Sequence, residues 1–138
     1  MLKKVLMVLG VIAQVSLFAD MPQGEMLERQ LWEDIAAGKW ENVKNQLAPC
    51  FQLVNNMGAH DQSEIDTTIK NFKAANLGFS DFKITECENL LIISYILQSK
   101  ITLGEKCVIS KDTRLSVWQK INGVWRWAAY ANVTPGGL

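Results

Sequence analysis

The side chains best suited to chemistry lie mostly in the C-terminal half of the chain. Arg114 stands in a largely apolar segment, where a buried guanidinium needs an acidic partner or an anionic ligand, and exposure at a strand end without a function is the alternative. Tyr95 and Tyr130 carry phenols that can donate hydrogen bonds to a ligand. His60 is the single histidine and precedes Asp61, so this pair can act as a general base if it faces a pocket. An exposed loop is the alternative reading of His60.

Two tryptophans of the same region, Trp118 and Trp127, can form an aromatic wall for a flat ligand, and packing in a core or dimer interface is the alternative. With one histidine and no Cys-x-x-Cys pair, the sequence predicts no metal site and no cofactor. The cysteines are Cys50, Cys87 and Cys107. Either Cys87 pairs with Cys107, because both lie near ends of neighbouring predicted strands, or all three are unpaired.

The N-terminal residues follow the order of residue types found in a secretory signal peptide. Lys3 and Lys4 precede an apolar run, Val5–Val15, and Ala19 supplies a small residue at the expected cut. The run is too short to span a bilayer, which takes about 20 apolar residues. We therefore expect a signal peptide over residues 1–19, a mature domain over residues 20–138 and a periplasmic or secreted location, with no membrane association after cleavage. A buried first helix is the alternative.

The composition limits the number of domains and excludes some classes of function. The 138 residues fit one domain, and 14 basic against 14 acidic residues give a formal charge of zero. No basic patch that would indicate nucleic-acid binding is visible.

Helical periodicity dominates the first half of the mature chain. Leu27, Leu31 and Ile35 predict a helix closed by Gly38, and a second short helix runs from Trp40 until Pro49 stops it. A strand at 51–55 and a return segment near His60 follow. Then Ser63 and Asp66 resemble a capping box that starts a third helix, expected to run to about Asn76 and to be closed by Gly78.

The second half predicts strands. Phe82 and Ile84 alternate with polar residues, and residues 90–97 are apolar on both faces, as in a central strand covered on two sides. Asn122-Gly123 joins a strand at 107–121 to one at 124–133. A regular register places Trp118 opposite Trp127, Ser116 opposite Ala129 and Leu115 opposite Tyr130. Arg114 and Trp118 then lie on one face and Tyr130 and Asn132 on the other, so they share a cavity only if a bulge or strong curvature intervenes.

This order of elements predicts an α+β domain whose antiparallel sheet wraps around helices. Five segments also carry a resemblance to known proteins: RLSVWQK at 114–120, NGVWRW at 122–127, YANVTP at 130–135, LAPCFQLV at 47–54 and SDFK at 80–83. They resemble the nuclear transport factor 2-like superfamily. The resemblance is strongest to its branch of small domains of unknown function related to SnoaL-like polyketide cyclases and to the calcium/calmodulin-dependent kinase association domain.

The resemblance implies a cone-shaped fold, with three N-terminal helices packed in a strongly curved antiparallel sheet, a pocket between sheet and helices, and a homodimer formed through the sheet. The association domain has an arginine at the position of Ser116, for which Arg114 is a substitute. Relatives often have histidine at the position of Tyr130, which a neutral phenol does not replace in proton chemistry. We expect the pocket to be lined by Tyr95, Arg114, Trp118, Tyr130 and Asn132, with His60 near its mouth.

Three functions remain open. The first is an exported domain that binds a small apolar or anionic ligand. The second is an enzyme of the cyclase, isomerase or dehydratase kind, with His60 or Asp61 as base. Because no acidic residue occurs from Arg114 to Lys120, the isomerase has little support. The third is a protein-interaction module.

Overall fold

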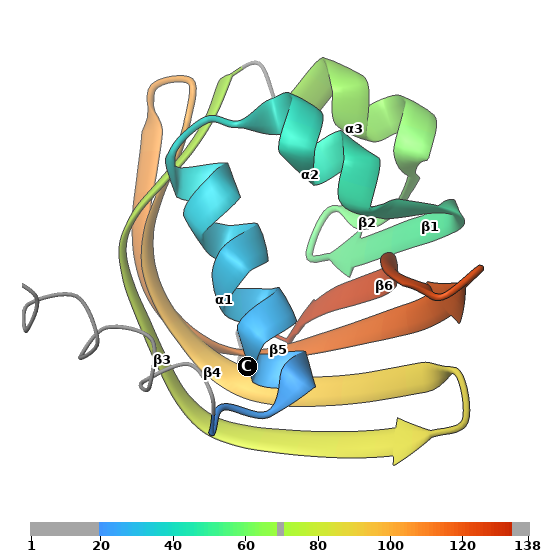
Figure 1. Ribbon diagram of the computed structural model, residues 1–138. Helices are drawn as coiled ribbons and strands as arrows, with labels where there is room; N and C mark the ends of the chain where they lie inside the picture. Colours follow the sequence, from blue (N-terminus) through green and yellow to red (C-terminus); the bar gives the residue numbers. More distant parts are fainter. Residues whose placement is uncertain (1–19, 69–70, 134–138) are drawn as a thin grey trace, which may run out of the picture.

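The computed structural model describes residues 20–68 and 71–133 (Figure 1). The expected signal peptide, residues 1–19, lies outside the described residues. The elements in chain order are α1 (Gln23–Ala36), α2 (Trp40–Gln46), β1 (Leu47–Asn55), β2 (Gly58–Asp61), α3 (Gln62–Thr68), β3 (Phe72–Cys87), β4 (Leu90–Leu103), β5 (Lys106–Ile121) and β6 (Val124–Val133). Among the described residues, no helix is long and apolar enough to cross a membrane.

The strands form one curved, open sheet around α1. The described part of this sheet has six strands in the order β2-β1-β6-β5-β4-β3, so β2 and β3 are its edges. Figure 1 shows the long strands β3, β4 and β5 bending around α1, while α2 and α3 lie toward the β1–β2 end. The expected α+β class is confirmed. The sheet is not entirely antiparallel, however, because β1 and β6 run parallel.

Two bulges bend β3. The pairing of β3 with β4 shifts between Ala75 and Gly78 and again between Ser80 and Lys83. Asn76 and Asp81, inside these shifts, adopt left-handed conformations with φ of 53° and 55°. Asparagine and aspartate tolerate this conformation better than most residues. Bulges increase the local bend of a strand, which lets β3 follow the surface of α1.

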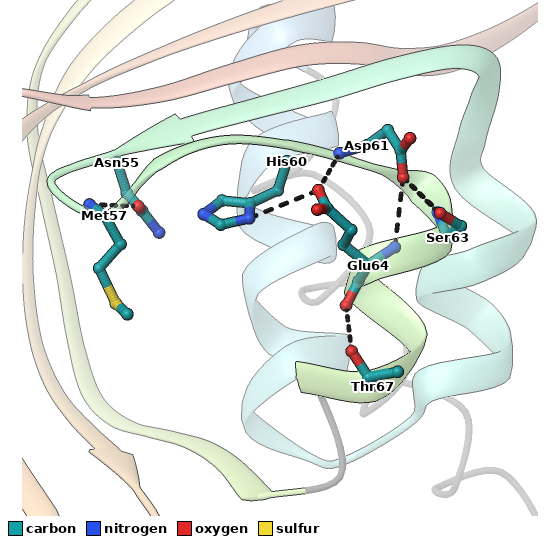
Figure 2. Close-up of polar contacts among 7 residues, drawn as sticks. All are labelled: Asn55, Met57, His60, Asp61, Ser63, Glu64 and Thr67. Atoms are coloured by element: carbon teal, nitrogen blue, oxygen red, sulfur yellow. Dashed lines mark hydrogen bonds and ion pairs between the residues drawn. The ribbon is translucent and has the colours of Figure 1, made fainter.

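The third helix is shorter than expected and is capped by other residues. Asp61 accepts hydrogen bonds from the backbone N–H groups of Ser63 and Glu64, and the Glu64 carboxylate accepts one from the Asp61 N–H (Figure 2). This is a capping box that begins two residues before Ser63. The prediction that the helix reaches Asn76 is wrong, because β3 already pairs with β4 at Phe72 and Leu103.

The β5–β6 hairpin contains a bulge, which the regular register predicted from the sequence did not include. Trp118 lies opposite Trp127 as expected, but Ser116 lies opposite Tyr130 and Leu115 opposite Ala131. The register shifts between Val117 and Trp118, where β6 has one extra residue. The expected pairs of Ser116 with Ala129 and of Leu115 with Tyr130 are therefore wrong. The shift brings Tyr130 and Asn132 to the same face as Arg114 and Trp118.

The core lies between α1 and the concave face of the sheet. Its fully buried members include Leu31 from α1, Phe51 from β1 and Ile93 from β4. β4 is an interior strand, between β5 and the edge strand β3. The expected cover on two sides is wrong, because Ile93 is 0% exposed and its neighbour Ile92 is 39% exposed. The helices all lie on the concave side.

The three cysteines are unpaired and exposed. The expected pairing of Cys87 with Cys107 is not formed, because these residues lie opposite Leu90 and Thr102, at opposite ends of β4. A disulfide requires Cα atoms within about 7 Å of each other, and the length of β4 separates these two.

Candidate functional site

A buried carboxyl group lies at the centre of the fold. Glu28, on α1, is 0% exposed. Its Oε1 accepts a hydrogen bond from Trp118 Nε1 at 2.6 Å, and its Oε2 accepts one from the Tyr95 hydroxyl at 2.7 Å. A third hydrogen bond comes from the side chain of Ser116. One helix and two neighbouring strands are thereby joined by a single acidic side chain.

Two further indoles extend these contacts. Trp32 Nε1 donates to the Tyr95 hydroxyl at 2.8 Å, and Trp127 Nε1 donates to Ser116 Oγ at 3.2 Å. Trp32 lies one helical turn after Glu28, so the two point to the same side of α1. Both hydrogen bonds end on hydroxyls that themselves contact Glu28.

Burial dominates the acid-base behaviour of this cluster. The pKa of Glu28 is raised because burial disfavours the charged carboxylate, although the hydrogen bonds from Trp118, Ser116 and Tyr95 act in the opposite direction. The pKa of Tyr95 is raised well above its usual value, first by burial and then by the nearby Glu28 carboxylate. Tyr95 is therefore a neutral phenol at physiological pH.

A second polar group lies beside the first. Arg114, cross-strand partner of Tyr95, donates from Nη1 to the Tyr130 hydroxyl at 2.5 Å and from Nη2 to Asp112 Oδ2 at 3.2 Å. Both side chains of the Arg114–Asp112 ion pair are less than a tenth exposed, at 5% and 8%. Burial raises the pKa of Tyr130, and Arg114 partly offsets this effect. Asp112 thus supplies the acidic partner that a buried Arg114 requires.

Two buried atoms of this second group have no hydrogen-bond partner among the described residues. They are Arg114 Nε and Asn132 Oδ1. Arg114 and Asn132 are direct cross-strand partners on β5 and β6. Leaving a buried donor or acceptor unpaired costs about 1–3 kcal/mol, so these two atoms are the least satisfied part of this polar group.

We call the following residues the interior polar network: Glu28, Trp32, Tyr95, Asp112, Arg114, Ser116, Trp118, Trp127, Tyr130 and Asn132. Five of the six residues named from the sequence as pocket lining belong to it: Tyr95, Arg114, Trp118, Tyr130 and Asn132. The bulge in β6 is what makes this possible. Without it, Tyr130 and Asn132 would lie on the opposite face from Arg114.

His60 lies apart from this network. Its Nδ1 is 3.5 Å from Glu64 Oε2, and its side chain is 29% exposed (Figure 2). Its backbone lies opposite Leu53, which in turn lies opposite Tyr130. His60 is therefore two strands away from Tyr130 in the sheet, and Asp61 caps α3 instead of assisting His60.

Sequence reasoning missed Glu28, Trp32, Asp112 and Ser116. For Glu28 a signal was present, since it precedes Leu31 by three positions and Ile35 by seven and so lies on the predicted apolar side of the first helix. A charged residue on such a stripe is buried with it. Asp112 precedes Arg114 by two positions on one strand, which places both side chains on one face.

Two further features concern binding sites outside the interior polar network. In the described part of the chain, no group of His, Cys, Asp and Glu is arranged to hold a metal ion. A shallow surface depression between β1 and the start of α3 is lined by Pro49, Cys50, Phe51, Gln52, Asp61, Gln62 and Ser63. None of these residues belongs to the interior polar network.

Comparison of whole structures identifies the fold. A nuclear transport factor 2-like protein from Cytophaga hutchinsonii superposes with a TM-score of 0.75 at 17% identity, covering 83% of this chain and 99% of that one. A putative calcium/calmodulin-dependent kinase II association domain from Exiguobacterium sibiricum gives 0.67 at 16% identity, covering 84% and 98%. A putative ketosteroid isomerase from Shewanella frigidimarina gives 0.59 at 16%, covering 76% and 89%.

The chain therefore has the nuclear transport factor 2-like fold, as the sequence resemblance implied. At these identities the similarity concerns the fold alone. No protein-family model matches the sequence, and no similar sequence was found among curated proteins.

Proposed function

We propose that this chain is an exported domain that binds a small molecule within its curved sheet, at the interior polar network. The observation that carries the proposal is the pair of buried, unpaired atoms, Arg114 Nε and Asn132 Oδ1, next to each other on neighbouring strands. A fold without an occupant gains nothing from burying a guanidinium and an amide in this way, whereas a binding site requires a few converging polar groups in an apolar surround.

Native mass spectrometry of the purified protein tests the binding proposal. We expect a mass above that of the polypeptide that is lost at higher collision energy, and we expect it to be absent from an Arg114→Met variant. A wild-type spectrum without bound small molecules, from protein prepared under several growth conditions, would count against it.

A second candidate function is proton-transfer catalysis. It is favoured by Glu28, a buried carboxyl of raised pKa that contacts Tyr95, since a carboxyl and a neutral phenol are the groups that an isomerase needs. A protein described as a putative ketosteroid isomerase is also among those that share the fold. Incubation with a β,γ-unsaturated cyclohexenone, followed by ultraviolet absorbance of the conjugated product, tests this. A rate equal to that of buffer, or unchanged in Glu28→Gln, would remove the enzyme from consideration.

The export part of the proposal rests on the order of residues 1–19. Fractionation of the producing cells and N-terminal sequencing should give a mature protein that begins at Asp20. Recovery of the protein from the cytosol with Met1 intact would show that the leader is not cleaved.

A further inference from the structure

Three exposed aliphatic side chains lie where β4 turns into β5. Leu103 is 38% exposed, Val108 57% and Ile109 76%. The turn between them is tied to the start of β3, because the Gly104 N–H donates to the Asn71 carbonyl. In Figure 1 this turn stands at one end of the sheet, beside the start of β3. We call Leu103, Val108 and Ile109 the apolar tip.

The apolar tip exposes side chains on both faces of the sheet. Val108 lies opposite Ile101, which packs against the core, so Val108 is on the concave side. Successive residues of a strand point to opposite faces, so Ile109 is on the convex side. A protein partner docked on the convex face, a second copy of this chain included, would cover Ile109 and leave Val108 in water. A fluid medium that surrounds this end of the sheet covers both.

Lysine side chains lie around the apolar tip. The parts of β3, β4 and β5 at this end of the sheet carry four exposed lysines, which we call the tip lysines: Lys73, Lys100, Lys106 and Lys111. Within residues 20–68 and 71–133, none of them forms an ion pair.

The acidic residues of these strand ends do not cancel the tip lysines. They are Glu105, in the turn, and Asp112, which is paired with Arg114. Four lysines and Glu105 give +4 − 1, a net charge of +3 at this end, in a chain whose formal charge is zero. The tip therefore attracts an anionic partner.

Exposed aliphatic groups next to unpaired lysines are the two features that bind a protein reversibly to an anionic membrane surface. The lysines attract the lipid headgroups, and the aliphatic groups enter the boundary between headgroups and acyl chains. The long lysine side chains can keep their ammonium groups among the headgroups while the tip is buried.

We propose that the apolar tip and the tip lysines dock this domain onto the surface of a bilayer that contains anionic phospholipids. The attachment goes beyond the proposed small-molecule site and does not depend on it. It departs from the expectation, drawn from the sequence, that the mature domain does not associate with a membrane.

Co-sedimentation with lipid vesicles tests the attachment. The protein of residues 20–138 is mixed with phosphatidylcholine vesicles that either contain or lack phosphatidylglycerol. We expect it to sediment with the anionic vesicles and to stay in solution with the neutral ones. Raising the ionic strength from about 0.05 M to about 0.5 M should release most of the bound protein, because salt screens exposed charges.

An aliphatic substitution tests the insertion of the tip. Ile109→Ala removes three carbon atoms from an exposed side chain, so the fold is kept, and each inserted methylene strengthens binding about fourfold. We expect this variant to bind anionic vesicles at least about tenfold more weakly than wild type. The matched control is Val124→Ala at the β5–β6 turn, where the side chain is 48% exposed, and it should bind like wild type.

Charge substitutions test the lysines. One basic residue near an anionic surface strengthens binding about fivefold, so Lys100→Gln/Lys111→Gln should weaken it about 25-fold. The control Lys83→Gln/Lys120→Gln has the same net charge, away from the tip, and should have a much smaller effect. Glu105→Gln removes the one unfavourable charge of the turn and should strengthen binding about fivefold.

A label at Cys107 reports directly whether the tip enters the lipid. Cys107 precedes Val108, whereas Cys87 lies near the other end of β4, and both thiols are exposed. A polarity-sensitive fluorophore on Cys107, in a Cys50→Ser/Cys87→Ser background, should shift its emission to the blue when anionic vesicles are added. The same fluorophore on Cys87, in a Cys50→Ser/Cys107→Ser background, should not.

The contrary outcomes are distinct. Equal binding to neutral and anionic vesicles overturns the role of the lysines. Binding to anionic vesicles that neither Ile109→Ala nor the double lysine variant weakens, with no emission shift at Cys107, means that another surface touches the lipid and overturns the inference. No binding to either vesicle also overturns it, and binding to polyglutamate in that case assigns the tip lysines to an acidic protein partner.

Discussion

A single carboxyl group decides how the interior of this protein is held together. Glu28 has no exposed surface, yet it is the shared acceptor for Trp118 and Tyr95 and also contacts Ser116. Removing the acceptor leaves these donors buried without partners, which costs more than the hydrogen bonds themselves contribute. The helix α1 is therefore fixed against β4 and β5 by polar contacts as well as by apolar packing.

Substitution of Glu28 should separate its acceptor role from its charge. Glu28→Leu leaves Trp118 Nε1 and the Tyr95 hydroxyl without an acceptor, and we expect it to lower the free energy of unfolding by about 3 kcal/mol. Glu28→Gln keeps one carbonyl oxygen and no charge, and should stay within about 1 kcal/mol of wild type at pH 7. Urea unfolding measures both, with Glu33→Leu on the exposed side of α1 as the control. Equal stability of the Leu and Gln variants would contradict the acceptor role.

The raised pKa of Glu28 should appear as a pH dependence of stability. Since the folded protein holds the proton more tightly than the unfolded chain, whose carboxyl has the ordinary pKa of 4.5, the folded state binds more protons between that pH and the raised pKa. The stabilising effect is complete below pH 4.5 and is lost as the pH rises through the folded pKa. The wild-type free energy of unfolding should therefore fall relative to Glu28→Gln as the pH is raised from 4 to 8. A constant difference would show that the pKa of Glu28 is not shifted.

At the level of single elements, the bulge in β6 controls which side chains reach the interior. One extra residue, Ala128, follows Trp127, and beyond it every side chain of β6 changes face relative to a regular strand. This change of face is what brings Tyr130 and Asn132 into the interior polar network.

Deletion of Ala128 should restore a regular register and turn Tyr130 and Asn132 to the convex face. Arg114 would then lose the Tyr130 hydroxyl, and a large apolar ring would leave the core. We expect a loss of at least about 3 kcal/mol, or no folding, measured by circular dichroism and urea unfolding. Ala128→Gly keeps the residue count and should cost about 1 kcal/mol or less. A deletion variant as stable as Ala128→Gly would mean that the bulge does not determine the face.

The same elements show what the sequence could and could not predict. Asn122-Gly123 between apolar runs was sufficient for the hairpin, and Gly38 for the end of α1, because each residue satisfies a local backbone requirement. The bulge at Ala128 has no local signal, since alanine fits either register and the choice is made by burial of Tyr130. The end of α3 was misjudged because Phe72 fits a helical stripe and a strand equally well, and its pairing with Leu103 depends on residues distant in the chain.

For the molecule as a whole, the convex face of the sheet is the main unexplained surface. The helices cover the concave side, and the convex side carries apolar side chains on neighbouring strands, including Ile92, Val117 and Ala129 in one cross-strand row and Leu115 and Ala131 in the next. Ile92 and Leu115 are 39% and 38% exposed. Exposed apolar side chains on neighbouring strands are a common feature of protein interfaces.

We expect a homodimer formed through this convex face. Sedimentation equilibrium at tens of micromolar should give twice the chain mass for wild type. Leu115→Asp should shift the distribution to monomer, because it places a charge among the apolar side chains of the convex face. Val124→Asp, at the exposed hairpin end, should remain dimeric. A monomeric wild type, or a dimer unaffected by Leu115→Asp, would exclude this interface.

The position of β6 has a consequence for the order in which the protein folds. The final strand of the described chain is inserted between β1 and β5, so the early hairpin β1–β2 has no sheet to join until residues 124–133 have been synthesised. A nascent chain that lacks this strand leaves Phe51 and the edge of β1 exposed, and the contacts that close the sheet connect distant parts of the sequence. Folding of this domain should therefore wait until β6 has been synthesised. A chain ending at Ile121 should show the circular dichroism of an unfolded protein, and a native-like spectrum from it would mean that the remaining strands fold independently of β6.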